Sequence, residues 1–393
     1  MRAQIFLATV LAIVTVGLAG ARPPVAAKLQ PFVDRHQIAG AVTLIGTKDE
    51  VVSVETVGAA DIGAGRPMPP DAVFWIASMS KSVTGTAVMM LVDEGKLNVD
   101  DPVEKYLPEF KGLMVVAEHD DDHVLLRKPS HPLTLRSLLT HTGGLVGHTV
   151  LEPRVDVLSL RENVLVYPLV PLQFEPGARY GYSNAGINTL GRIVEVVSGL
   201  SFDEFLRQRL FAPLGMKYTT FLPDADQLKR IAKSYRPNAA MTGLEEVPID
   251  QLTYPLSNRA RGVSPAGGLF STAQDMYRLG RMILNGGTYG GRRYLSAAAI
   301  AQMTSNQIGE LPIGPNPDYG YGFGWVVHRV HHADDPTGPG NYGAGGAYNT
   351  QLEIDPTHNL IAVLMVQQAG CPESDRQGLR TAFTQAAEDA RDR

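Results

Sequence analysis

The sequence is poor in cysteine and carries no strong charge of either sign. Among its 393 residues there is one cysteine, Cys371, so no disulfide can form within the chain. The net charge is −5, with 35 Lys and Arg against 40 Asp and Glu, which provides no basic surface for nucleic acid. Hydrophobic residues make up 44% of the chain, so the fold must be stabilised by an apolar core.

Three kinds of catalytic site are also poorly represented. The Gly-x-Ser-x-Gly pentapeptide of α/β-hydrolases is absent, because GYSNA and GVSPA each lack the final glycine. Metal-ligand residue types occur in EHDDDH (118–123) and HHADD (331–335), but their compact spacing in polar segments is typical of solvated turns. Cys371 follows an apolar run and is expected to be a packed residue. We therefore expect no metal site, no other cofactor and no thiol nucleophile.

The only long apolar run lies at the start of the chain. Arg2 precedes an apolar stretch over 5–18, and small residues and prolines follow it, which is the layout of a secretory signal over 1–27. Cleavage after Ala21 or after Ala27 fits this layout, and an uncleaved anchor is the alternative. We expect a periplasmic or secreted bacterial protein with no membrane contact beyond this segment.

Both chain ends have mixed helix and strand character, whereas the middle is helical. Two strands over 39–47 and 50–58 around the turn at Lys48 and Asp49 indicate a hairpin, and a short helix over 25–37 precedes them. The last third predicts three strands and a helix, at 322–330, 348–356, 360–368 and 374–391. Helical periodicity marks 133–141, 185–199, 201–211 and 272–287, and Ser201 with Glu204 predicts a capping box. The predicted fold class is α/β (α+β), with one antiparallel sheet from 28–100 and 261–393 flanked by helices, and a mainly helical lobe over 101–260.

The segment FWIASMSKSVTG combines serine and lysine at the start of a helical pattern. Ser78 and Lys81 are three residues apart, so their side chains lie on one face of a helix. Free N–H groups and the helix dipole at this end favour a developing oxyanion. Taken on its own, the segment is explained better by an N-capping serine followed by a solvated lysine. Ser80 has Val83 rather than lysine three residues on, so we expect it to support the Lys81 and Tyr182 side chains.

Two further segments contain groups that suit a substrate site. Tyr182 and Asn184 precede a predicted helix, and they point the same way if Ser183 is extended. The segment NYGAGGAYNT (341–350) places glycines before a strand, which allows close approach of a substrate to the backbone. His141 ends a predicted helix, and we interpret it as a capping or packing residue.

In this order and spacing, the three segments resemble the serine β-lactamase and penicillin-binding superfamily. The resemblance is to the branch with class C β-lactamases, D-Ala-D-Ala carboxypeptidases and family VIII carboxylesterases. It extends over most of the chain, since LTLRSLLTHTGGL (133–145), LFAPLGMKYT (210–219) and SPAGGLFSTAQDM (264–276) are also similar to family segments. It implies a β-lactamase/transpeptidase-like fold and a serine hydrolase that forms an acyl-enzyme.

The resemblance also implies a role for each site residue. Ser78 is the nucleophile, Lys81 its partner, and Tyr182 the general base in acylation and proton donor to the leaving group. The N–H groups of Ser78 and of Ala347 on the edge strand form the oxyanion hole. The implied substrate-binding residues are Asn184, Ala344, Gly345 and Gly346.

The third segment departs from the family pattern, because Ala344-Gly345-Gly346 stands where class C enzymes carry Lys-Thr-Gly. The missing cation helps to hold a substrate carboxylate, a contact worth roughly 1.5 to 3 kcal/mol. We therefore expect short-chain neutral esters as substrates, unless Arg259 or Arg261 replaces the cation. β-Lactams and D-amino-acid peptides remain alternatives, as does a non-catalytic module that binds cell-wall peptide.

Overall fold

The computed structural model describes residues 24–147, 154–314, 317–330 and 337–391. Within them, an antiparallel eight-stranded sheet has the order β12-β13-β14-β15-β16-β1-β2-β3. Its strands are β1 Gly40–Gly46, β2 Val51–Asp61, β3 Arg66–Pro67, β12 Tyr319–Tyr321, β13 Val326–His328, β14 Tyr342–Gly345, β15 Gln351–Asp355 and β16 Leu360–Val366. The first and last strands of the chain pair directly, with Ala41 opposite Val366. The predicted sheet from both chain ends is confirmed.

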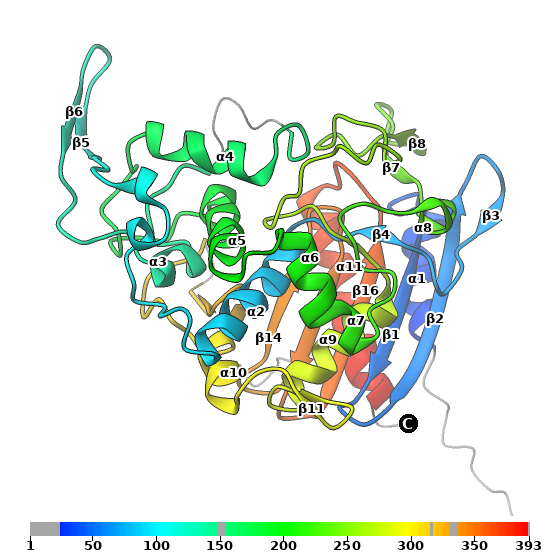
Figure 1. Cartoon of the computed structure of the whole chain (residues 1–393). Coiled ribbons are helices and arrows are strands. Elements are labelled where there is room, and N and C mark those ends of the chain that lie inside the picture. The colour runs from blue at the N-terminus through cyan, green and yellow to red at the C-terminus, as the bar shows by residue number, and fades with distance from the viewer. Residues whose placement is uncertain (1–23, 148–153, 315–316, 331–336, 392–393) are drawn as a thin grey trace, which may run out of the picture.

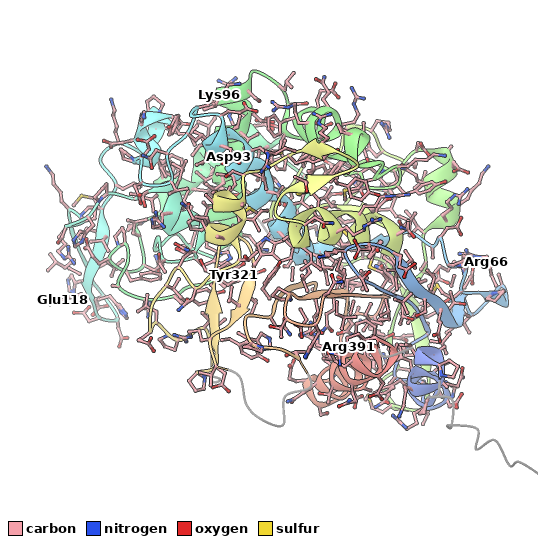
Figure 2. The ribbon with its side chains drawn as sticks, turned by 90° about the horizontal axis from the view of Figure 1, so that it is seen from below. Arg66, Asp93, Lys96, Glu118, Tyr321 and Arg391 are labelled. Atoms are coloured by element: carbon pink, nitrogen blue, oxygen red, sulfur yellow. The ribbon has the colours of Figure 1, made fainter. Side chains whose placement is uncertain are left out.

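The two central strands are apolar because helices cover both faces of the sheet. Every residue of β1 and β16 is buried. The helices α1 (Val25–Asp34) and α11 (Glu373–Arg391) pack on one face, and α9 (Ala273–Leu284) packs on the other (Figures 1 and 2). Continuous apolar runs are the expected pattern for strands buried on both sides.

The helical part of the chain packs around α2 (Ser80–Asp93) and α5 (Asn184–Ser198), which contact each other (Figure 1). The remaining helices are α3 Leu135–Leu139, α4 Leu160–Val166, α6 Phe202–Leu206, α7 Ala212–Leu214, α8 Ala225–Arg230 and α10 Ala297–Met303. Four short strand pairings complete the structure: β5 Val115–His119 with β6 Val124–Arg127, β7 Ser234–Pro237 with β8 Leu244–Val247, β4 Phe74–Trp75 with β9 Phe270–Ser271, and β10 Thr288–Tyr289 with β11 Arg292–Arg293. The domain limits at residues 100 and 260 stay a prediction.

Four smaller expectations concern a helix cap, two polar segments and the N-terminal apolar segment. The capping box is wrong, because the Ser201 hydroxyl donates to Asp203 at 2.6 Å and Glu204 pairs with Arg207. The segment 118–123 forms an exposed hairpin turn, as expected for a solvated turn. The segment 331–335 and most of the expected signal lie outside the described residues. None of the described helices is long and apolar enough to cross a bilayer.

The third motif lies within the sheet rather than on its edge. β14 contains Ala344 and Gly345 and lies between β13 and β15, so the expectation of an edge strand is wrong. However, the pairing with β13 ends at Gly343, since β13 contributes only Val326 and Val327 to it. Ala344 and Gly345 therefore have no strand partner on the β13 side, although β14 is an inner strand of the sheet.

A close backbone contact fixes α2 against the sheet. A Cβ atom added to Gly85 would lie 2.3 Å from the carbonyl oxygen of Phe323. We predict that Gly85→Ala lowers the free energy of unfolding by roughly 1 to 3 kcal/mol, although alanine normally stabilises a helix interior. Denaturant titration measures this change, with Gly63→Ala as a control at a glycine whose added Cβ meets nothing closer than 3.6 Å. A stabilising effect of Gly85→Ala would contradict the contact.

Candidate active site

The structure brings together the three predicted catalytic side chains. Ser78 lies in the 3₁₀ turn Ala77–Met79 that leads into α2, and Lys81 lies in the first turn of α2. The Lys81 Nζ atom is 3.1 Å from the Ser78 Oγ atom, and the Tyr182 hydroxyl donates a hydrogen bond to the same Oγ at 2.7 Å. Two proton-transfer groups thus contact one partly exposed hydroxyl.

The backbone before the nucleophile is strained and is held by Ser80. Ala77 has a φ of 45°, a left-handed conformation that is unfavourable for a residue with a side chain. The buried Ser80 hydroxyl donates to the Ala77 carbonyl at 2.7 Å and accepts from the Leu269 N–H at 3.2 Å. Ser80 therefore supports the backbone of the turn, and not the Lys81 and Tyr182 side chains as expected.

Lys81 is buried beneath the nucleophile, with 2% of its surface exposed. Burial lowers the pKa of Lys81 to about 7, because removal from water disfavours the charged amine. Its Nζ also donates to the Ala266 carbonyl at 2.7 Å. A large fraction of the amine is therefore neutral at physiological pH and able to accept a proton.

The Ala266 carbonyl belongs to a loop that is fastened to α2 and α5. The Ala266 N–H donates to the side-chain oxygen of Asn188 in α5 at 3.0 Å, and the hydroxyl of Thr84 in α2 donates to the Pro265 carbonyl at 2.8 Å. The sequence marked this segment only as similar to the family. The contact with Lys81 is made by a backbone carbonyl, which every residue type has. The sequence of the segment therefore could not predict this contact.

Tyr182 is positioned to donate a proton rather than to accept one. Although 45% of its surface is exposed, burial around its hydroxyl raises the pKa of Tyr182 to about 12, and the hydrogen bond with Ser78 offsets this only in part. The Lys81 Nζ lies 4.6 Å from the centre of the Tyr182 ring, but a neutral amine does not stabilise a phenolate. The two pKa directions favour Lys81, and not Tyr182, as the base.

The imidazole ring of His141 packs against the ring of Tyr182. Its ring centre is 4.7 Å from that of Tyr182, its Nδ1 accepts from the Ser183 N–H at 3.2 Å, and its Nε2 is 3.2 Å from the Tyr321 hydroxyl. Burial and the nearby Lys81 hold the pKa of His141 well below its usual value. The expected packing role therefore includes positioning of the tyrosine.

The Tyr-x-Asn segment has the predicted conformation. Ser183 is extended, with φ −136° and ψ 116°, and its hydroxyl caps α5 by accepting from the Gly186 N–H. Alternate residues of an extended segment share a face, so the extended Ser183 agrees with the expectation that Asn184 lies on the same side as Tyr182. This half-buried residue begins α5 at the edge of the site.

The third motif reaches the nucleophile through a glycine contact. A Cβ atom on Gly346 would lie 2.4 Å from the Ile76 carbonyl oxygen, so only glycine permits this approach. Ala347 is therefore close to the turn that carries Ser78. Its N–H donates no hydrogen bond to any described residue, and the Ser78 N–H lies in the first turn of a helix, where helical acceptors are absent. These two N–H groups suit the predicted oxyanion hole.

Neither predicted arginine replaces the missing cation. Arg261 is 4% exposed and forms an ion pair with Asp156, with Nε 3.2 Å from Oδ2. Arg259 donates to the Leu222 carbonyl at 2.7 Å. The assignment of Arg261 to substrate binding is therefore wrong, because its charge is already neutralised by a buried carboxylate.

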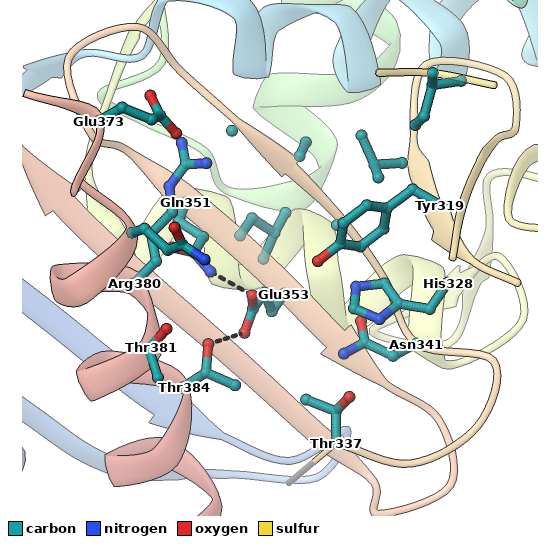
Figure 3. A pocket seen from close by; sticks show the side chains of 17 residues that line it. Tyr319, His328, Thr337, Asn341, Gln351, Glu353, Glu373, Arg380, Thr381 and Thr384 are labelled. Atoms are coloured by element: carbon teal, nitrogen blue, oxygen red, sulfur yellow. Dashed lines mark hydrogen bonds between the residues drawn. The ribbon is translucent and has the colours of Figure 1, made fainter. Parts of the chain in front are cut away.

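A different arginine, Arg380 of α11, lies beside the third motif. A Cβ atom on Gly345 would be 3.1 Å from its Nη2 atom. Arg380, Ala344 and Gly345 line one cavity of about 600 Å³, and Figure 3 shows the guanidinium reaching from α11 past Gln351. No described residue forms a hydrogen bond or ion pair with this guanidinium. Arg380 was not predicted from the sequence, because helix packing brings it to the motif from 35 residues away.

Comparison with known proteins agrees with this geometry. The family model described as Beta-lactamase matches residues 25–387. The chain belongs to the beta-lactamase family. It is 31% identical over 332 residues to Penicillin-binding protein 4 of Amycolatopsis lactamdurans, covering 84% of this chain and 81% of that protein.

Two further relatives of this beta-lactamase-family chain are hydrolases by name. Esterase EstB of Burkholderia gladioli is 29% identical over 382 residues, covering 88% of this chain and 91% of that protein. The solved structure of EstCE1, a hydrolase with promiscuous acyltransferase activity, has a TM-score of 0.78 and 25% identity, covering 93% and 97%. The predicted β-lactamase/transpeptidase-like fold and the serine hydrolase class are thus confirmed.

The lowered pKa of Lys81 predicts how activity depends on pH. If neutral Lys81 is the base, kcat/KM for a neutral ester rises with pH through a midpoint of about 7 and then stays level, because deprotonation activates the amine. Lys81→Met should lower kcat/KM by roughly 10² to 10⁴-fold and remove this limb.

Tyr182→Phe is the matched variant for this pH profile. It should slow the reaction but keep the rise of kcat/KM through pH 7. Rates between pH 5.5 and 9.5, taken as round working limits around the titration, test this order. A limb that persists in Lys81→Met would show that another group is the base.

Proposed function

We propose that this protein is an exported hydrolase that cleaves short-chain carboxylic esters through an acyl-enzyme on Ser78. The observation that carries the proposal is the Ser78 hydroxyl held between the Lys81 amine and the Tyr182 hydroxyl. A nucleophile, a base and a proton donor at hydrogen-bond distance are the parts that acyl transfer requires.

Acylation follows from these contacts. Neutral Lys81 accepts the Ser78 proton while Oγ attacks the ester carbonyl carbon, and the N–H groups of Ser78 and Ala347 stabilise the tetrahedral oxyanion. As the ester bond breaks, the Tyr182 hydroxyl gives its proton to the departing alkoxide, and the Lys81 ammonium returns a proton to Tyr182. Water then attacks the acyl-enzyme by the same route, which releases the carboxylic acid and restores Ser78.

The preference for neutral esters rests on the third motif and on relatives. Ala344 and Gly345 supply neither the cation nor the hydroxyl with which class C enzymes hold a carboxylate. EstB is an esterase by name, and it matches nearly the full length of this chain.

Arg380 supports a second candidate, hydrolysis of substrates that carry a carboxylate. Its guanidinium lies beside Gly345 and forms no hydrogen bond or ion pair with a described residue, although Glu353 and Glu373 interact with its charge electrostatically. The guanidinium hydrogen-bond donors can therefore receive an anionic group. β-Lactams and peptides ending in D-alanine are substrates of this kind.

Export is proposed from the signal-like segment, and the fold favours one cleavage position. Val25 and Leu29 of α1 are fully buried, and the Ala26 N–H donates to Glu55 at 2.8 Å. Cleavage after Ala27 would remove part of this packed helix, whereas cleavage after Ala21 leaves it complete. We propose a periplasmic or secreted location.

Removal of the nucleophile tests the proposed reaction. We expect Ser78→Ala to lower kcat for p-nitrophenyl butyrate by at least about 10³-fold, because no other group forms the acyl-enzyme. Ser80→Ala is the matched control and should keep measurable activity, since Ser80 only holds the backbone of the turn. Equal losses in the two variants would contradict the assignment, and an inactive parent protein would favour a non-catalytic binding module.

Arg380 and its neighbour Arg376 allow a test of substrate class. We expect Arg380→Met to lower kcat/KM for a chromogenic cephalosporin roughly ten-fold or more relative to p-nitrophenyl butyrate, because a charged hydrogen bond to the carboxylate is lost. Arg376→Met serves as control, since that arginine is paired with Glu373 at 3.6 Å. An unchanged ratio would show that Arg380 does not contact the substrate.

A further inference from the structure

A second group of chemically active side chains lies away from Ser78, where the β15–β16 turn meets α11. The His358 Nδ1 atom is 2.9 Å from Asp355 Oδ2 and 3.5 Å from Glu388 Oε2, and the three ligand atoms lie within 4.8 Å of one another. Asp355 and Glu388 are buried, with 3% and 7% of their surfaces exposed. An imidazole and two buried carboxylates thus converge on one point.

We propose that Asp355, His358 and Glu388 bind a divalent first-row transition-metal ion, with Zn²⁺ as the probe, which fastens the β15–β16 turn to α11. Imidazole and carboxylate are both good ligands for Zn²⁺, at distances of about 2.0 to 2.2 Å. Two such ligands in a tetrahedral arrangement are about 3.3 Å apart. The His358 Nδ1 atom lies 2.9 Å from one carboxylate oxygen and 3.5 Å from the other, on either side of that value. The two carboxylates also balance the charge of the ion.

A buried amide near the same point is the second, independent observation. Asn341 is 1% exposed, and neither its amide oxygen nor its amide nitrogen has a hydrogen-bond partner among the described residues. Asn341, Asp355 and Glu388 line one small cavity of about 10 Å³, room for a single water molecule. Figure 3 shows Asn341 beside His328, among the residues that line the larger cavity next to Arg380. A metal-bound water in this cavity would complete the coordination and satisfy the amide.

The surroundings of the cluster hold its ligands in place. The His358 N–H donates to Asp355 Oδ1 at 2.9 Å, and the Gly338 N–H donates to Asp355 Oδ2. The Arg391 guanidinium donates to Glu388 Oε2 at 2.9 Å. The metal ion would share this oxygen with the guanidinium, since a carboxylate oxygen has lone pairs for both. Outer contacts of this kind orient metal ligands. Figure 2 shows Arg391 on α11 at the outer side of the molecule.

The proposed ion would be structural and separate from the reaction. Gln351, at the other end of β15, pairs with Gly345, so four residues of strand separate Asp355 from the third motif by about 13 Å. Along α11, Arg380 and Glu388 are separated by about 12 Å. The inference does not rest on the proposed function.

Zinc titration of the chelator-treated full-length protein tests the site. We expect the parent to bind one more Zn²⁺ per chain than His358→Gln by calorimetry, and Glu388→Gln to bind that ion at least ten-fold more weakly. His123→Gln is the matched control, because His123 is also paired with an aspartate but lies on an exposed turn. Zinc should raise the thermal midpoint of the parent and of His123→Gln by a few degrees and leave that of His358→Gln unchanged.

The rate of ester hydrolysis, measured on the same samples, separates this test from the proposed function. Binding of zinc at this site should leave that rate unchanged. Equal zinc stoichiometry in the parent and His358→Gln would overturn the proposal and leave the cluster as a histidine in contact with two carboxylates. If His358→Gln does not fold, anomalous diffraction at the zinc edge from crystals of the parent decides: a peak between the three ligand atoms supports the site, and its absence refutes it.

Discussion

The buried amine of Lys81 is the feature on which the rest of the site depends. Moving the pKa from 10.5 to about 7 corresponds to on the order of 5 kcal/mol against the charged form, so the fold pays for an amine of which a large fraction is neutral near pH 7. Because the folded-state pKa is lowered, this cost to stability is greatest below pH 7 and disappears above the unfolded value near 10.5. The Ala266 carbonyl and the Ser78 hydroxyl satisfy the amine, and both are held by further hydrogen bonds.

The arrangement around Lys81 joins three parts of the chain that are far apart in sequence. α2 supplies the lysine, the segment before α5 supplies Tyr182, and the loop before α9 supplies the carbonyl. Ser80 and His141 contact none of the reacting atoms, yet one holds the strained Ala77 and the other packs under Tyr182. A strained residue and a buried lysine are both costly, and they persist here because the surrounding structure determines them.

Local patterns predicted well those parts of the fold that depend on local forces. The β1–β2 hairpin, the buried strands and the pairing of Ser78 with Lys81 follow from periodicity and helical spacing, and the family resemblance supplied the partners. The capping box at Ser201 failed because Asp203 and Arg207 offered better partners to Ser201 and Glu204. Arg380 and the Ala266 carbonyl were missed because tertiary packing alone brings them to the site. Arg261 looked available in sequence, but a buried aspartate over 100 residues away neutralises it.

Labelling with a fluorophosphonate, followed by intact-mass and peptide mass spectrometry, tests the central claim most directly. We predict a single adduct per chain, on Ser78, and no adduct in the Ser78→Ala variant. An adduct on Ser80 or on any other residue would contradict the assignment of Ser78 as the nucleophile and with it the role given to the neutral lysine beside it.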